Sequence, residues 1–288
     1  MDLLPQHLVN GLALGSTYAL VAMGLTLVFG VLLIPNFAHG EFCMVGAFVS
    51  YTLVALGFNF WLAVLAAACV IALLGVLVDR LVFRPLETAP GLTLMIASLG
   101  TSIILQELAH LIWGSAPRTT PMPLPGVIRT GMFSITYYQI VLFVALMAIW
   151  GGLWLTLHRS RLGLAIRAVS QLRDAAQLMG INLDRVRIAT FLIGAGIGGL
   201  SGALLGAMYP IYPSVGVNPI LKAFVVLVLG GIGNLWGAVL GGLVLGVVEV
   251  MVAGYVSSEL QDAGSFLILV LVLLVRPQGL LGRAQVER

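Results

Sequence analysis

The chain has 288 residues, of which 60% are hydrophobic and only 9% are charged, and its mean hydropathy is +1.10. Soluble domains carry about 25% charged and about 45–50% apolar residues, so this composition excludes a water-soluble globule. The hydrophobic runs approach 20 residues and lack the alternation of an outer-membrane barrel, which predicts membrane-spanning α-helices. We therefore expect an all-α, polytopic transmembrane helix bundle that forms a single domain over residues 1–288.

Runs of about 20 apolar residues, the length that crosses a hydrocarbon core about 30 Å thick, mark the predicted spans. They lie at 8–34, 41–57, 60–83, 92–113, 137–157, 188–208, 220–236, 238–256 and 264–276. Two are irregular, because Gly230 to Asn234 interrupt the run at 220–236 and the run at 264–276 is short. Either run could form a half-helix that is packed inside the protein and does not cross the membrane. The pattern therefore predicts eight or nine spans.

The basic residues indicate an orientation, since cytoplasmic loops are enriched in Lys and Arg. All of them except Lys222 are arginines, and all but Arg118 and Arg129 lie in 79–90, in 158–187 or at the C-terminus, which carries Arg276, Arg283 and Arg288. We expect these three segments to be cytoplasmic, and the Pro-rich stretch 114–136 to be an external loop. Nine spans place the N-terminus outside and the C-terminus inside, whereas eight spans place both ends inside.

Glycines recur at intervals of four residues in two of the spans. These series are Gly194, Gly198, Gly202 and Gly206, followed by Gly233, Gly237 and Gly241. Such spacing leaves a stripe without side chains on a helix, along which another helix approaches closely. The stripes serve either packing within the chain or a subunit interface or sliding seam.

The residues that catalysis and metal binding need are not arranged for those tasks. The sequence holds no Ser, His and Asp set and no metal-ligand spacing, and Cys43 and Cys69 lie inside apolar runs where we expect them to be buried. Lys222 follows Pro219-Ile220-Leu221 rather than a Gly-rich turn, which excludes a Walker-type phosphate loop. We expect no enzyme activity, no metal and no nucleic-acid partner.

The polar segment 158–187 contains an amphipathic pattern. Its apolar residues step by three or four positions: Leu162, Ile166, Val169, Leu172, Ala176 and Met179. Gly180 stands where a left-handed C-cap is needed, and Asn182 reads as the N-cap of the next span. Such a helix either lies on lipid headgroups or inserts as a plug into a cytoplasmic partner.

The second alternative is favoured by Asp174-Ala175-Ala176, three further residues and Gly180. This resembles the cytoplasmic loop of ABC importer permeases, whose pattern is Glu-Ala-Ala, three residues and Gly, here with Asp in place of Glu. A wider resemblance, to LivH-type permeases of branched-chain amino acid ABC importers, rests on four stretches. They are 10–48, Arg84-Pro85-Leu86, 160–168 with Arg167-Ala168, and 229–238 with Leu229-Gly230-Gly231-Ile232-Gly233-Asn234.

The resemblance implies a permease subunit in a bacterial cytoplasmic (inner) membrane. It implies a coupling role, by docking on an ATPase, for Arg167, Asp174, Ala175, Ala176 and Gly180. The implied partners are a second, LivM-type permease, two ATP-binding subunits that hold ATP and magnesium, a periplasmic substrate-binding protein and the lipid bilayer. The chain itself is expected to hold no cofactor. Related permeases carry urea or short amides, and a stand-alone channel or secondary transporter remains the alternative from another class.

Polar residues inside predicted spans are expected to have a structural or functional role, because a charged side chain at mid-helix costs about 2.5–3.5 kcal/mol on insertion scales. The candidates for a translocation path or gate are Asn36, His39, Glu41, Thr101, Gln106 and Glu107. Glu41 is either an interfacial carboxylate or part of a gate, and a helix broken at depth would aim freed backbone groups at a cavity. Thr101, Glu107 and His110 are expected to share an inward face, as a hydrogen-bond cluster or as a path lining.

Overall fold

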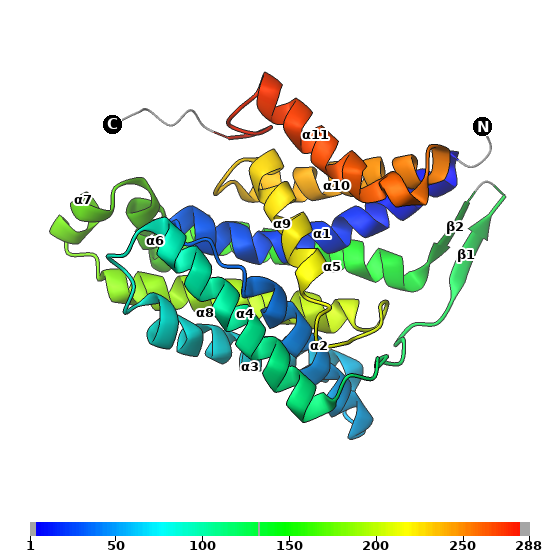
Figure 1. Ribbon diagram of the computed structural model, residues 1–288, viewed down its shortest axis with the longest axis horizontal. Helices are drawn as coiled ribbons and strands as arrows, with labels where there is room; N and C mark the ends of the chain where they lie inside the picture. The colour runs from blue at the N-terminus through cyan, green and yellow to red at the C-terminus, as the bar shows by residue number, and fades with distance from the viewer. Residues whose placement is uncertain (1–3, 132, 283–288) are drawn as a thin grey trace.

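A computed structural model describes residues 4–131 and 133–282, and this part of the chain is a bundle of helices (Figure 1). Arg283 and Arg288, which the charge pattern assigns to the cytoplasmic side, lie outside the described residues. In chain order the elements are α1 (Leu4–Leu32), α2 (His39–Ala55), α3 (Phe60–Val78), η1 (Asp79–Phe83), α4 (Gly91–Trp113), β1 (Val127–Thr130), β2 (Phe133–Thr136), α5 (Tyr137–Arg159), α6 (Arg161–Gln171), α7 (Arg173–Leu178), α8 (Leu183–Leu205), α9 (Val217–Gly230), α10 (Leu235–Tyr255), η2 (Ser258–Leu260) and α11 (Gln261–Val275).

Within the described residues, seven helical segments are long and apolar enough to cross a membrane: 4–32, 60–83, 91–113, 137–159, 183–205, 235–255 and 258–275. The all-α bundle is thereby confirmed, and α11 gains the length that its apolar run lacked because the 3₁₀ turn η2 precedes it. The other two predicted spans are shorter helices, α2 with 17 residues and α9 with 14. The predicted interruption of the run at 220–236 is confirmed, because α9 ends at Gly230 and Gly231 has φ +100°.

The two short helices, α2 and α9, begin in the interior of the bundle and not at its ends. A Cβ on Gly24 would lie 2.8 Å from the His39 ring, so α2 starts beside a point eight residues before the end of α1, about 12 Å along its axis at 1.5 Å per residue. A Cβ on Gly40 would lie 2.3 Å from the carbonyl oxygen of Gly216, the residue before α9. The starts of α2 and α9 therefore meet at depth, as the broken-helix alternative for Glu41 requires.

Glycines let the central helices approach one another closely. A Cβ on Gly202 of α8 would lie 1.8 Å from the Cys43 carbonyl oxygen of α2, and one on Gly194 would lie 3.0 Å from the Gly24 carbonyl oxygen of α1. Further along α8, Gly198 faces His39 and Gly206 faces Ala47. In the second series Gly233 lies against Gly30, Gly237 against Gly230, and Gly241 against Val226. Both stripes thus lie between helices of this chain.

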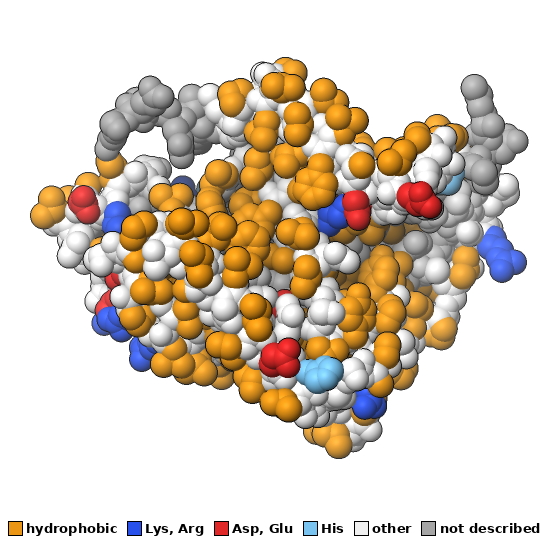
Figure 2. Space-filling model, viewed as in Figure 1, with side chains coloured by type: hydrophobic (Ala, Val, Ile, Leu, Met, Phe, Trp, Pro, Cys, Tyr) orange, Lys and Arg blue, Asp and Glu red, His pale blue; other side chains and the backbone are white. Residues whose placement is uncertain are grey.

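Hydrophobic side chains cover most of the face shown in Figure 2, and charged ones are few. Large apolar residues such as Leu73, Leu111 and Leu274 are exposed, as expected of an outer surface solvated by lipid. The expected burial of both cysteines holds for Cys43 and is wrong for Cys69, which lies on the exposed side of α3.

The stretch 114–136, which the sequence predicts to be an irregular external loop, contains a β-hairpin. Strands β1 and β2 pair antiparallel, with Val127 opposite Thr136 and Thr130 opposite Phe133. The hairpin lies at the right edge of Figure 1 and α7 at the left edge, so the two polar segments occupy opposite ends of the bundle. That separation agrees with the predicted assignment of the two segments to opposite sides of a membrane.

Candidate functional site

The segment 158–187 folds as two short helices. The Ser160 hydroxyl accepts the Gly163 N–H at 2.9 Å and begins α6, which buries Ile166 and Val169 against the bundle. Leu172 then adopts an extended backbone, with φ −150° and ψ 95°, and separates α6 from α7. The prediction of one continuous amphipathic helix is therefore wrong, because this residue interrupts it.

The short helix α7 presents apolar side chains outward. Leu178 and Met179 are 88% and 84% exposed, whereas Ala176 is buried. Leu172 and Met179, which the amphipathic pattern assigns to its apolar face, are likewise exposed, as either alternative for that face requires. Two large apolar residues at one end of the bundle are costly to leave in water, which indicates a covered surface.

The turn after α7 has the predicted capping geometry. Gly180 has φ +83°, a left-handed conformation that glycine adopts without strain, and its N–H donates to the Gln177 carbonyl at 3.0 Å. Asn182 then caps α8 by accepting the Arg185 N–H at 3.0 Å. Of the other residues that resemble a coupling motif, Asp174 and Ala175 are exposed on α7 and Arg167 is half-buried on α6.

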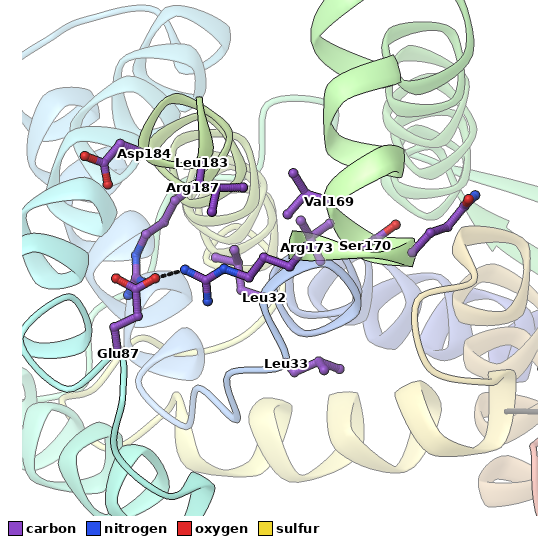
Figure 3. A pocket seen from close by; sticks show the side chains of 11 residues that line it. Leu32, Leu33, Glu87, Val169, Ser170, Arg173, Leu183, Asp184 and Arg187 are labelled. Atoms are coloured by element: carbon purple, nitrogen blue, oxygen red, sulfur yellow. Dashed lines mark hydrogen bonds and ion pairs between the residues drawn. The ribbon is translucent and has the colours of Figure 1, made fainter. Parts of the chain in front are cut away.

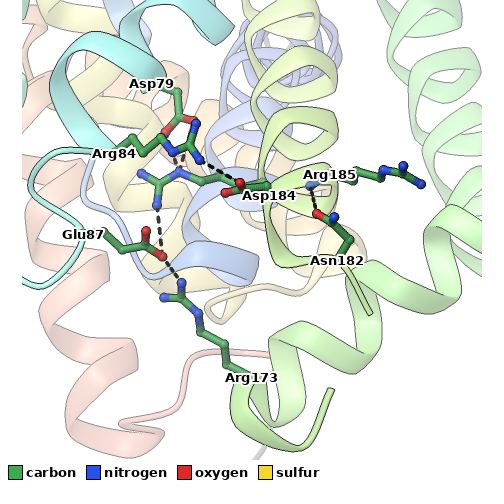
Figure 4. A network of polar contacts seen from close by, with 8 residues as sticks. Asp79, Arg84, Glu87, Arg173, Asn182, Asp184 and Arg185 are labelled. Atoms are coloured by element: carbon green, nitrogen blue, oxygen red, sulfur yellow. Dashed lines mark hydrogen bonds and ion pairs between the residues drawn. The ribbon is translucent and has the colours of Figure 1, made fainter. Parts of the chain in front are cut away.

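A chain of ion pairs connects this segment to the spanning helices (Figure 4). Arg187 of α8 bonds both carboxylate oxygens of Asp79, at 2.8 and 3.1 Å, and both side chains are buried. Glu87 lies 3.6 Å from Arg187 and also pairs with Arg173, the first residue of α7. The pairs therefore run without a gap from η1, at the end of α3, through α8 to α7.

A cavity of about 230 Å³ adjoins these ion pairs (Figure 3). Leu32 and Leu33 at the end of α1 line it together with Val169 of α6 and the side chains of Arg173 and Arg187. The ends of α1 and α6 and the start of α8 therefore leave a space between them, and the Arg173–Glu87 ion pair connects α7 to the bundle beside this space.

The break between α1 and α2 buries a second polar group. Glu41 is 0% exposed, and one of its carboxylate oxygens, Oε1, accepts from Ser102 at 2.9 Å and from Gln106 at 2.7 Å, both on α4. The other oxygen, Oε2, finds no hydrogen-bond partner among the described residues and lies 2.8 Å from where a Cβ of Gly216 would stand. Glu41 thus stands between α4 and the start of α9.

The remaining polar candidates divide between the interior and the surface. Asn36 and His39 are fully buried, and their side-chain polar atoms have no partner within the part of the chain that the structure describes. Thr101 is buried and bonds its own helix at Ala97. The expected inward face holds for Thr101 and is wrong for Glu107 and His110, which α4 turns outward, whereas Ser102 and Gln106 lie inward.

Sequence reasoning missed a charged cluster at Lys222. Its ammonium donates to Glu249 of α10, to Asp262 of α11 at 2.7 Å and to Ser265 at 3.0 Å. Glu249 also accepts from the Tyr18 hydroxyl at 2.6 Å. The signal was present, since Lys222, Glu249 and Asp262 are ionisable residues in or beside apolar runs, and such residues are costly unless paired.

Together, the apolar bundle, the ionisable groups buried between its helices and the apolar helix at one end define a polytopic membrane permease. The chain belongs to the family described as branched-chain amino acid transport system / permease component, whose profile matches residues 7–275. The resemblance seen in the sequence motifs is thereby confirmed.

Named relatives match over nearly the whole chain. The high-affinity branched-chain amino acid transport system permease protein LivH of Salmonella typhimurium is 40% identical over 98% of this chain and 97% of its own length. BraD of Pseudomonas aeruginosa, with the same description, is 41% identical over the same shares. A probable LivH of Methanocaldococcus jannaschii is 30% identical over 91% of this chain and 88% of its own length. No solved structure matches the chain.

Proposed function

We propose that this chain is the membrane-spanning permease subunit of an ABC importer that moves leucine, isoleucine and valine into the cell. The observation that carries the proposal is that the similarity to LivH and BraD covers 98% of the chain, including the exposed helix α7 as well as the bundle. A helix that offers Leu178 and Met179 outward has the form of a plug for a partner protein.

In this proposal α7 and Gly180 dock into a groove on an ATP-hydrolysing subunit. Burying one Leu or Met side chain contributes about 1.5–3 kcal/mol, so two such residues hold a partner firmly. Asp174 and Ala175, which are exposed on α7, lie at the same contact. Arg167 lies on α6, which packs on the bundle, and in this proposal Arg167 lies next to the docking surface and not on it.

Movement of α7 passes to the spanning helices through the ion pairs. Arg173 connects α7 to Glu87, and Arg187 connects Glu87 to Asp79. Because Arg187 belongs to α8, a pull on α7 acts on the helix that carries the Gly194 to Gly206 stripe. Smooth glycine contacts permit small sliding of α8 against α1 and α2, which is the motion that alternating access needs.

The partners follow from this role. They are a second, LivM-type permease, two ATP-binding subunits that hold ATP and magnesium, and a periplasmic protein that delivers substrate. The chain acts as a transport subunit and not as an enzyme, in a bacterial inner membrane. The Arg-rich end with α6 and α7 faces the cytoplasm, and the hairpin faces outside.

We place the gate of the path at the break that holds Asn36, His39 and Glu41. Buried ionisable and amide groups at a helix break are the arrangement in which transporters handle polar solutes. Thr101 and Gln106 face the same region from α4, whereas Glu107 faces away from it.

The partner periplasmic protein provides the test of the substrate. It should bind leucine, isoleucine or valine, which can be measured by calorimetry with the purified protein. If it binds urea or a short amide instead, the permease is an amide importer and the substrate part of the proposal is wrong. Flux of leucine through liposomes that hold this chain alone would support a stand-alone channel or secondary transporter.

A further inference from the structure

A second cavity lies beside the start of α9. Its volume is about 340 Å³, at the lower end of the range of about 300–1,000 Å³ typical of small-molecule sites. Its walls come from α1, α2, the end of α8, the connection to α9 and the first turns of α9. Gly216 belongs to this wall and also adjoins Glu41, so the cavity and the proposed gate share one element.

Most of the wall is apolar, and its charge is confined to one place. Leu14, Val21 and Met44 are among the apolar wall residues, and among the described residues the two charged ones of the wall are Lys222 and Asp262. Their side chains form an ion pair with 2.7 Å between Nζ and Oδ1. A ligand of this cavity would therefore carry an aliphatic part and a charged part.

The two members of this pair differ in how firmly they are held. Lys222 is 10% exposed and also donates to Glu249 and Ser265, which do not line the cavity. Asp262 has a side chain that is 78% exposed, and the bond to Lys222 is its one ion pair among the described residues. Lys222 is thus fixed from behind by Glu249, whereas Asp262 is free to exchange its partner.

We infer that the Lys222–Asp262 pair in this cavity binds the α-carboxylate and α-ammonium groups of an amino-acid zwitterion during its passage. The carboxylate of the substrate takes the place of Asp262 on the Lys222 ammonium, and the ammonium of the substrate pairs with the released Asp262 carboxylate. Both groups sit on one carbon, so they fit between side chains that are already neighbours. The inference rests on the proposed function and names the residues that recognise its substrate class.

Charge balance supports this exchange. Lys222 and Glu249 neutralise each other in the buried part, which leaves one negative charge on Asp262 at the wall. A zwitterion adds no net charge when it inserts, so no uncompensated charge is created inside the bundle. An anion would meet Asp262 without a partner, and an uncharged amide such as urea would leave the ion pair in place.

The test uses the complete importer, with its ATPase subunits, second permease and binding protein, in liposomes with radiolabelled leucine. Asp262→Asn should lower the initial uptake rate per assembled complex by about tenfold or more, the effect of losing a charge-assisted hydrogen bond. Glu259→Gln is the matched control, because Glu259 is an exposed acid three residues earlier that does not line the cavity. It should retain the wild-type rate.

A pair of variants that leaves the charges intact tests the cavity separately. Leu14→Trp fills the cavity and should also lower uptake about tenfold, whereas Leu12→Trp, two residues earlier on the exposed side of α1, should not. A wild-type complex that accumulates no leucine would overturn the proposed function and the premise of this assignment. A wild-type complex that accumulates leucine, with Asp262→Asn or Leu14→Trp at the same rate, would overturn the cavity assignment alone.

Discussion

Arg187 of α8 bonds both carboxylate oxygens of Asp79 through its Nε atom, in a place where both side chains are nearly closed to solvent. Asp79 begins the π-helical turn η1 that extends α3, so this one contact fastens the end of α3 to the start of α8. Glu87 adds a second acid on the other side of the guanidinium and leads on to Arg173 of α7. The polar end of the bundle is therefore tied to its apolar part by paired charges.

Replacing one partner of the Asp79–Arg187 pair should lower the free energy of unfolding more than replacing both partners. Arg187→Met leaves the Asp79 carboxylate buried without a partner, and we expect a loss of about 3–5 kcal/mol in the free energy of unfolding. The double variant Asp79→Leu, Arg187→Met should recover most of that loss. Thermal unfolding of the purified chain in detergent measures both. Equal losses in the single and double variants would contradict the role given to the pair.

The exposed apolar tip of α7 should matter for assembly and not for folding. Replacing Leu178 and Met179 with Ser removes about 1.5–3 kcal/mol of burial per residue at the partner contact, so the dissociation constant for the ATPase subunit should rise about tenfold or more. Leu164→Ser, at an exposed site on α6 before the break, is the matched control. Pull-down of the ATPase by the tagged permease measures this. Unchanged capture by the α7 variant would remove α7 from the contact.

Glycine at position 202 should be irreplaceable, unlike glycine at position 151. A Cβ at 202 would meet the Cys43 backbone at 1.8 Å, so Gly202→Ala should force α8 away from α2 and cost about 1–3 kcal/mol or more. A Cβ at 151 of α5 would meet no atom of the described residues within 4 Å, and Gly151→Ala should stabilise the helix by about 0.5–1 kcal/mol. Melting temperatures in detergent compare the two. A stable Gly202→Ala protein would show that the contact is looser than described.

The two glutamates near α4 should respond differently. Glu41→Leu removes the acceptor of the Ser102 hydroxyl, at about 1–3 kcal/mol, and leaves Gln106 Nε2 with only the longer bond to Ser102, whereas Glu41→Gln keeps an oxygen for both donors. Glu107→Leu on the outward face should change stability by less than about 0.5 kcal/mol. Thermal unfolding of the three variants is the measurement. Strong destabilisation by Glu107→Leu would instead support the inward position of Glu107 that the sequence pattern predicts.

Composition and apolar runs were sufficient to predict the class of fold, because lipid leaves helices as the way to satisfy backbone hydrogen bonds in such runs. The turn at Gly180 and the cap at Asn182 were also predictable, since both depend on local backbone chemistry. The Gly202 spacing indicated a close helix contact, although not that Cys43 provides its other side.

The pairing of residues that are distant along the chain could not be predicted from the sequence. Asp79 and Arg187 are 108 positions apart, and Lys222 and Asp262 are 40 apart, so no periodicity connects them. The break at Leu172 was missed because the apolar spacing continues across it. The outward turn of Glu107 was missed for a related reason. A step of six and then three residues from Thr101 only approximates one helical face, and Glu41 selects Ser102 and Gln106 instead.

We propose that this chain moves branched-chain amino acids only as part of an ATP-driven complex. Uptake of radiolabelled leucine should be measured in liposomes that hold either the complete importer or this chain alone, each with and without ATP. We predict ATP-dependent accumulation by the complete importer and no flux through the chain alone. Leucine flux through the chain alone, or no leucine accumulation by the complete importer, would contradict the account.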